Sequence, residues 1–288
     1  MEHLPEDCFS YVLSLTSPID AGRISAVSSV IKSAADSDKV WEKFLPSDYY
    51  QIITRLVSPP PCCSSMKDLF LRLCNPQLID GGKKMFKLEK SSKKLYILSA
   101  RELTITWANN PLYWTWKSDL LHSRFGEVAE LRTICWLEIY GNIKIKMLSP
   151  RTHYTAYLIV KFANRAFGLD TLPSQVSVEV GNKIKSRSTV YLRCSRQEST
   201  KRVLETIMFL NRVSALRSRV VGAGGDGGGR GVVREREDGW VEIELGRFFN
   251  GGGEEEEEEE EVKMCLKEVT GEHLKGGLIV EGIELRPN

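Results

Sequence analysis

The 288-residue sequence lacks any apolar run approaching 18 residues, so it offers no candidate transmembrane helix. Its acidic N-terminal stretch, Met1 to Asp7, has no long apolar segment, and we expect no secretory signal peptide. Neither charge dominates, because 40 Lys and Arg residues face 38 Asp and Glu residues. A near-neutral total argues against a protein that mainly coats nucleic acid or an anionic membrane. We therefore expect neither of these as a partner.

Patterns of common catalytic, nucleotide and metal sites are also missing. The four histidines lie far apart, and the seven cysteines show neither a C-x-x-C pair nor zinc-ligand spacing. No nucleophile elbow, His-Glu-x-x-His motif or P-loop occurs. We expect a protein without catalytic activity, metal or cofactor. The odd, scattered cysteines fit free thiols in a reducing compartment.

The first segment, residues 1–56, has the pattern of short helices. Leu4-Pro5-Glu6-Asp7 is typical of a helix start, with acidic residues in the first turn. Apolar residues then recur at helical spacing in three groups, which predicts three helices: Phe9, Val12, Leu13 and Leu15; Ile24, Val27, Val30 and Ile31; Val40, Trp41, Phe44 and Leu45. About fifty residues make a small core, so we expect this block to dock on a partner.

Residues 57–93 are predicted to be a linker that contains one amphipathic helix, Met66 to Leu73, after the triproline 59–61. From about Lys94 the pattern changes to period-two alternation in many short runs. Asn, Gly and Pro turns separate these runs, which are centred near residues 97, 105, 138, 158, 178 and 242. This pattern predicts an antiparallel β-sandwich over residues 94–288.

Two segments interrupt the sandwich pattern, at residues 199–231 and 251–261. The basic part, 199–221, is either a nucleic-acid or nuclear-import patch or a solvated, marginal helix. A glycine tract at 222–229 is typical of a flexible linker. Eight consecutive glutamates, 254–261, must be solvated because adjacent carboxylates cannot be buried together.

The densest aromatic cluster, Trp107 to Trp116, spans an Asn-Asn-Pro turn. Its rings can stack on sugar faces or bases, or they can close the end of the sandwich core. Two acidic pairs could accept hydrogen bonds from ligand hydroxyls, or they could simply be solvated: Glu127 with Glu130, and Glu261 with Glu268. Trp136 and Trp240 lie in alternating strands, and we assign them to the sandwich core or its rim.

The N-terminal block resembles an F-box, the helical motif that docks substrate receptors on the adaptor of SCF-type cullin–RING ubiquitin ligases. The matching stretches are Leu4-Pro5-Glu6-Asp7, Val12-Leu13-Ser14-Leu15, Asp20-Ala21, Val27-Ser28 and Val40-Trp41-Glu42. The resemblance implies six adaptor-binding residues: Leu4, Pro5, Val12, Leu13, Val27 and Trp41.

Residues 94–288 resemble the phloem protein 2, or Nictaba-like, lectin domain of plants. The matching stretches include residues 99–107, 110–116, 127–131, 136–141, 238–246, 248–250 and 277–288. The resemblance implies a jelly-roll-like sandwich and a glycan site. Its residues would be two tryptophans, Trp107 and Trp114, and two glutamates, Glu261 and Glu268.

Together the two resemblances predict an α+β multidomain protein, with a small helical F-box followed by an antiparallel β-sandwich lectin domain. The implied function is a substrate receptor of an SCF-type ligase that recognises N-acetylglucosamine- or galactose-containing glycans or glycoproteins. The implied location is the cytoplasm and nucleus. The alternative is a carbohydrate- or protein-binding phloem or stress protein that acts without a ubiquitin ligase.

Overall fold

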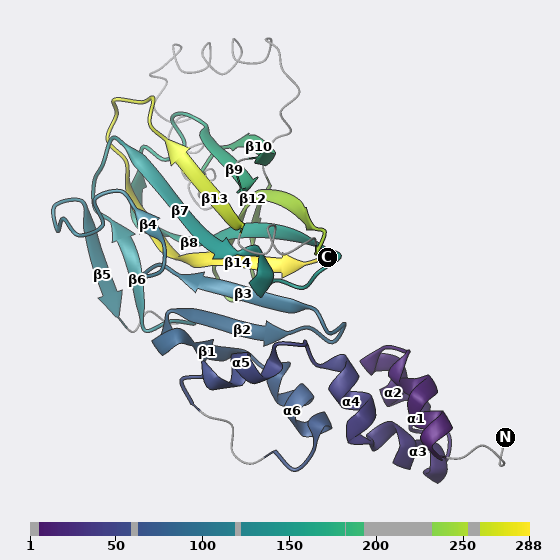
Figure 1. The fold of residues 1–288 in the computed structure, drawn as a ribbon. Helices are drawn as coiled ribbons and strands as arrows, with labels where there is room; N and C mark the ends of the chain where they lie inside the picture. The colour runs from purple at the N-terminus through teal and green to yellow at the C-terminus, as the bar shows by residue number, and fades with distance from the viewer. Residues whose placement is uncertain (1–5, 59–62, 119–121, 182, 193–231, 253–259) are drawn as a thin grey trace, which may run out of the picture.

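The computed structural model describes residues 6–58, 63–118, 122–181, 183–192, 232–252 and 260–288. Among these residues, α-helices lie in the N-terminal quarter of the chain and strands predominate after them (Figure 1). The helices are α1 (Glu6–Ser14), α2 (Pro18–Ile24), α3 (Ser29–Asp36), α4 (Asp38–Phe44), α5 (Tyr49–Thr54) and α6 (Met66–Leu73). The predicted helix at 66–73 is confirmed.

Residues 6–54 form five helices rather than the predicted three. Ser28 adopts an extended conformation, and its hydroxyl accepts a hydrogen bond from the amide of Ile31. This cap begins α3 and separates it from α2, so the apolar series from Ile24 to Ile31 does not form one helix. The helix α5 was not predicted.

Two antiparallel sheets form a sandwich, which confirms the predicted fold class. The first sheet runs in the order β1 (Gln77–Ile79), β2 (Lys84–Leu88), β3 (Lys94–Ser99), β14 (Gly276–Pro287), β8 (Thr152–Phe167), β12 (Val241–Asn250) and β11 (Val233–Glu235). β6 (Glu127–Leu131) also pairs with β14, and β5 (Trp114–Ser118) pairs with β6. The second sheet runs β10 (Lys183–Val190), β9 (Ser174–Val180), β13 (Glu261–Glu268), β7 (Leu137–Lys144) and β4 (Thr104–Ile105).

The predicted linker, residues 57–93, contributes two strands to the first sheet. β1 and β2 pair with each other, and β2 pairs with β3 in full register. Phe86 and Leu88 of β2 are completely buried in the main core. The sheet therefore begins before the predicted boundary at residue 94.

The helical block rests on the β1–β2 edge of the sandwich (Figure 1). Leu56 forms a β-bridge with Ile79, and the Arg55 guanidinium donates two hydrogen bonds of 2.8 Å to Asp80. The Lys94 ammonium lies 3.0 Å from the Asp48 carboxylate. A single hydrophobic cluster runs from the helices into the sandwich. The small helical core is thus completed by the rest of the same chain.

Three predicted features lie outside the described residues. They are the segment 199–231, the glycine tract 222–229 and most of the acidic run, residues 254–259. Among the described helices, none has the length and apolar character needed to cross a membrane.

Candidate functional site

The helical end of the molecule carries an exposed apolar face. Its members come from α1, α2, α3 and the turns between them, and each is at least 43% exposed: Tyr11, Val12, Leu15, Ile19, Val27 and Val30. No described residue covers these side chains. Large apolar residues clustered this way on a small helical block mark a docking surface.

The predicted adaptor-binding residues divide between this face and the core. Val12 and Val27 are 59% and 70% exposed, so both are available to a partner. Leu13 and Trp41 are buried, and the Trp41 indole donates a 2.7 Å hydrogen bond to the Ala35 carbonyl. These two residues therefore hold the helices together instead of contacting a partner. Leu4 and Pro5 lie outside the described residues.

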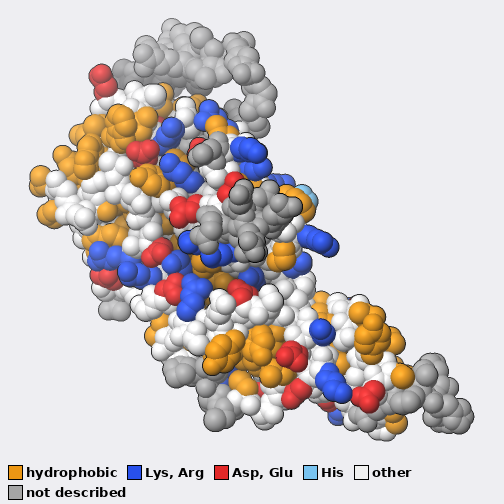
Figure 2. Space-filling model, in the orientation of Figure 1, with side chains coloured by type: hydrophobic (Ala, Val, Ile, Leu, Met, Phe, Trp, Pro, Cys, Tyr) orange, Lys and Arg blue, Asp and Glu red, His pale blue; other side chains and the backbone are white. Residues whose placement is uncertain are grey.

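A second exposed apolar surface, here termed the aromatic end, lies at the opposite end of the sandwich. Figure 2 shows hydrophobic side chains gathered there, on the left of the view. Its members are between 45% and 68% exposed: Trp107, Leu112, Trp136, Phe167 and Leu274. Backbone contacts join the segments that carry them. The amide of Thr106 bonds to Glu138, Ile134 bridges to Lys275, and Phe167 pairs with Gly276.

Trp107 has an unusual backbone conformation for an exposed tryptophan. Its φ of 58° lies in the left-handed region, where a bulky side chain is a genuine outlier. The ring is 50% exposed and lies against Tyr113, with ring centroids 5.2 Å apart and the ring planes tilted by 36°. Strain of this kind concentrates at binding sites and costs on the order of 1–3 kcal/mol. Trp107 is therefore well placed to present a flat face to a ligand.

Trp114 does not share this surface, contrary to the prediction from the family resemblance. It is only 2% exposed, and its indole donates a 3.0 Å hydrogen bond to the Thr106 carbonyl. The turn after Trp107 sends Trp114 into the main hydrophobic core. A ring enclosed in this way cannot stack on a sugar without local unfolding.

Glu268 also points inward, so it is not positioned to accept a bond from a ligand hydroxyl. Its Oε2 lies 2.5 Å from the Lys275 ammonium, and the two side chains are each 2% exposed. Oε1 accepts a 2.8 Å bond from the amide of Gly271. The Nε2 atom of His273 also lies 3.8 Å from Oε2. Burial lowers the pKa of Lys275. The pair ties β13 to the loop that precedes β14.

Glu261 lies at the opposite end of β13 from Glu268. The two are seven positions apart, which is about 23 Å along a strand at ~3.3 Å per residue. Because seven is odd, they also face opposite sides of the sheet: Glu261 is exposed and Glu268 is buried. The four predicted glycan-binding residues therefore do not form one site. Only Trp107 lies at the aromatic end with its ring exposed.

Trp136 also lies at the aromatic end. Its place in an alternating strand predicted that it belongs to the sandwich core or its rim. It is 45% exposed, and its indole donates a 3.4 Å hydrogen bond to Glu138. In the Trp136–Gly141 run, Leu137 and Ile139 are buried, so the alternate positions face outward. By contrast, Trp240 is completely buried as predicted, and its indole bonds to the His122 carbonyl.

Comparison with known families matches both modules of the chain. The phloem protein 2 family matches residues 93–287, and the F-box domain family matches residues 1–43. The chain belongs to the phloem protein 2 family and carries an F-box. Neither is a known family of enzymes.

Similar proteins in Arabidopsis thaliana share this architecture over their whole length. "F-box protein PP2-B15" is 45% identical, over 99% of this chain and 96% of the relative. "F-box protein VBF" is 44% identical, over 100% of this chain and 99% of the relative. Among solved structures, a family 35 carbohydrate binding module from Clostridium thermocellum covers 66% of this chain and 96% of the module. It shows 10% identity and a TM-score of 0.31, which is too low to inform the site.

Proposed function

We propose that this F-box protein is the substrate-receptor subunit of an SCF-type cullin–RING ubiquitin ligase, which recognises glycans or glycoproteins through its phloem protein 2 domain. One observation supports this proposal above others. The F-box helices expose an apolar face at one end of the chain, and the aromatic end lies at the other. A receptor needs two such separate surfaces to hold the ligase and the target together.

The adaptor of the ligase binds the exposed apolar face of α1, α2 and α3 in this proposal. Val12 and Val27 are its most exposed predicted contacts. Truncating a hot-spot side chain of an interface typically weakens binding by about 2 kcal/mol or more. Leu13 and Trp41 support the face from beneath.

The glycan binds at the aromatic end, where Trp107 and Trp136 present half-exposed indoles. Sugar rings have apolar C–H faces that stack on such rings. Glu138, which accepts a hydrogen bond from the Trp136 indole, can also accept one from a sugar hydroxyl. N-acetylglucosamine- or galactose-containing glycans are the proposed ligands.

The chain itself catalyses no step in this proposal. It holds a glycosylated target close to the loaded conjugating enzyme, which raises the effective concentration of target lysines. Other subunits transfer ubiquitin. The proposed location is the cytoplasm and nucleus, and neither nucleic acid nor a membrane takes part.

Co-purification with the SCF adaptor tests the ligase half of the proposal. The double variant Val12→Asp/Val27→Asp should lose the adaptor, because two charges would enter the apolar contact. Leu71→Asp is the matched control, since Leu71 is 50% exposed on α6, outside this face. Circular dichroism should show that both proteins stay folded.

If the double variant and the control recovered equal amounts of adaptor, the assignment of this face as the docking surface would be wrong. Failure of the unmodified chain to bind any SCF adaptor would instead favour a carbohydrate- or protein-binding role without a ubiquitin ligase.

A further inference from the structure

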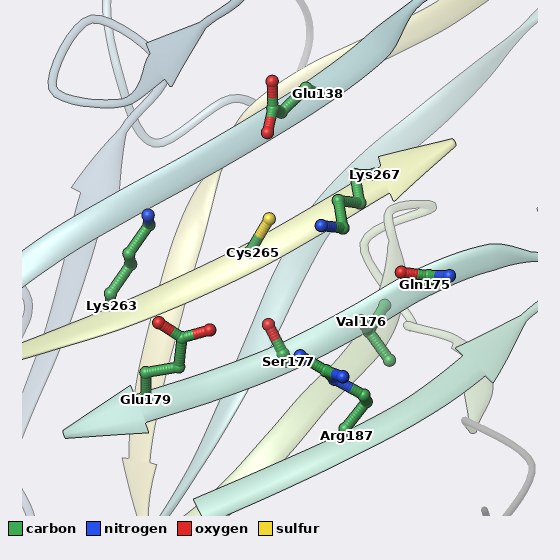
Figure 3. Close-up of a pocket in the computed structure, with 9 residues that line it drawn as sticks. All are labelled: Glu138, Gln175, Val176, Ser177, Glu179, Arg187, Lys263, Cys265 and Lys267. Carbon is green, nitrogen blue, oxygen red and sulfur yellow. The ribbon is translucent and has the colours of Figure 1, made fainter. Parts of the chain in front are cut away.

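The outward side of the five-stranded sheet contains a shallow hollow of about 70 Å³ (Figure 3). Nine residues from four neighbouring strands line it: Glu138, Gln175, Val176, Ser177, Glu179, Arg187, Lys263, Cys265 and Lys267. Cys265 lies at its centre, and burial raises the pKa of its thiol, which therefore stays protonated. The rim is polar, with three cationic and two carboxylate side chains.

Two pairs of opposite charges around the hollow stand directly across from each other but form no ion pair. Lys267 is the register partner of Glu138, and Lys263 is the register partner of Glu179. Side chains in such positions are close enough to interact, with Cβ atoms about 5 Å apart. Glu138 instead accepts a hydrogen bond from the Trp136 indole, and the Lys263 ammonium lies 4.8 Å from the centroid of the Tyr140 ring.

The remaining charged groups are free in the described part of the chain. Glu179, Arg187 and Lys267 make no side-chain hydrogen bond or ion pair with another described residue. In Figure 3 the Glu138 and Glu179 carboxylates and the Arg187 guanidinium point toward the middle of the hollow from β7, β9 and β10. Donors and acceptors therefore converge there without satisfying each other.

A sugar hydroxyl both donates and accepts a hydrogen bond, so it can bridge a carboxylate and an ammonium that do not meet. The site carries one more cation than carboxylates, and Arg187 can hold a carboxylate with two parallel bonds. We infer that this hollow binds an acidic oligosaccharide, one whose sugar units carry carboxylates. The inference rests on the proposed glycan recognition. Glu138 belongs both to the aromatic end and to the lining of the hollow, so a bound glycan would continue from the aromatic end across the sheet.

An acidic peptide is the competing occupant, and the lining favours the sugar. Protein interfaces depend on buried aromatic or aliphatic anchors, which need apolar pockets. The hollow offers only Val176 and Cys265 as apolar lining, and both are buried in the sheet. The Glu138 and Glu179 carboxylates would also repel a run of Asp or Glu, which has few hydrogen-bond donors to satisfy them.

Calorimetric titration of the full chain with a galacturonate tetramer tests the inference. The fully methyl-esterified tetramer serves as the uncharged control, and octaglutamate serves as the acidic peptide. We expect the acidic tetramer to bind more tightly than either, with affinity that falls as salt is added. Arg187→Gln/Lys267→Gln should weaken its binding about tenfold or more. Lys43→Gln/Lys90→Gln removes two exposed charges far from the hollow and should leave binding unchanged.

The inference would be overturned if the two double variants bound the acidic tetramer equally well. It would also be overturned if the unmodified chain bound the methyl ester and the acid equally well. Octaglutamate binding that depends on Arg187 and matches the tetramer would also overturn it in favour of a peptide. A parallel titration with a neutral N-acetylglucosamine tetramer and Trp107→Ala separates this outcome from the proposed function. If the unmodified chain and Trp107→Ala bind the neutral tetramer equally well, or if neither binds it, the stacking site is wrong while binding of the acidic tetramer still supports the acidic site.

Discussion

Single residues separate binding from stability at the aromatic end. Trp107→Ala should weaken glycan binding by ~1–3 kcal/mol, the scale known for stacking of bases on aromatic rings. It should change the free energy of unfolding by no more than about 1 kcal/mol, because the ring is half exposed and its backbone is strained. Trp114→Ala should instead cost ~3–5 kcal/mol of stability, as expected for a buried aromatic.

Glycan titration and denaturant unfolding of both tryptophan variants provide the comparison. The assignment fails if Trp114→Ala keeps its stability while Trp107→Ala unfolds.

The buried pair of Glu268 and Lys275 should matter for stability and not for sugar contact. Glu268→Gln leaves the Lys275 ammonium buried without its counter-charge, which typically costs about 3–5 kcal/mol. The double variant Glu268→Gln/Lys275→Met removes both charges and should recover much of that loss. Urea unfolding of the three proteins measures both effects. A double variant less stable than Glu268→Gln would contradict this reading.

Residue parity shows what the sequence could and could not reveal. Glu261 and Glu268 are an odd number apart on one strand, so the pattern alone places them on opposite faces. The same rule predicts that the Trp136 side chain faces outward, because its neighbour Leu137 is buried. Trp107 and Trp114 could not be sorted this way. The left-handed backbone at Trp107 and the turn that follows decide which ring turns inward.

At the scale of elements, the fold class and most strands followed from period-two alternation. The division of the helical block could not be predicted in this way. Serine residues cap the end of α2 and the start of α3, and both lie within one apolar series. β1 and β2 were also missed. Each is short, and β2 has adjacent buried residues where alternation was expected. Their edge position against the helices explains that burial.

The contact between α5 and the first sheet should depend on pH. The Arg55 guanidinium, with Lys84, holds the pKa of Asp80 at about 2. A depressed pKa stabilises the fold above the unfolded value of about 4, and this contribution disappears as the pH falls through 2. Asp80→Asn should therefore cost about 2 kcal/mol at pH 7 and progressively less between pH 4 and 2.

Asp7→Asn is the control, because Asp7 is 86% exposed and its ion pair with Lys39 should contribute little. Urea unfolding across this pH range measures both variants. A constant difference between wild type and Asp80→Asn would refute the assignment.

At the scale of the whole molecule, one continuous core joins the F-box helices to the sandwich. The docking face and the aromatic end are therefore held at opposite ends of one body (Figure 1). Binding at one end leaves the other uncovered. The two modules should unfold in a single calorimetric transition, and two well-separated transitions would contradict this coupling.

The most direct test of the central claim is a glycan titration of the chain while it is bound to the SCF adaptor. The account predicts that the bound complex takes up an N-acetylglucosamine- or galactose-containing glycan with the affinity of the free chain, and that Trp107→Ala weakens this binding without releasing the adaptor. A glycan that displaces the adaptor, or a complex that binds no glycan while the free chain does, would contradict it.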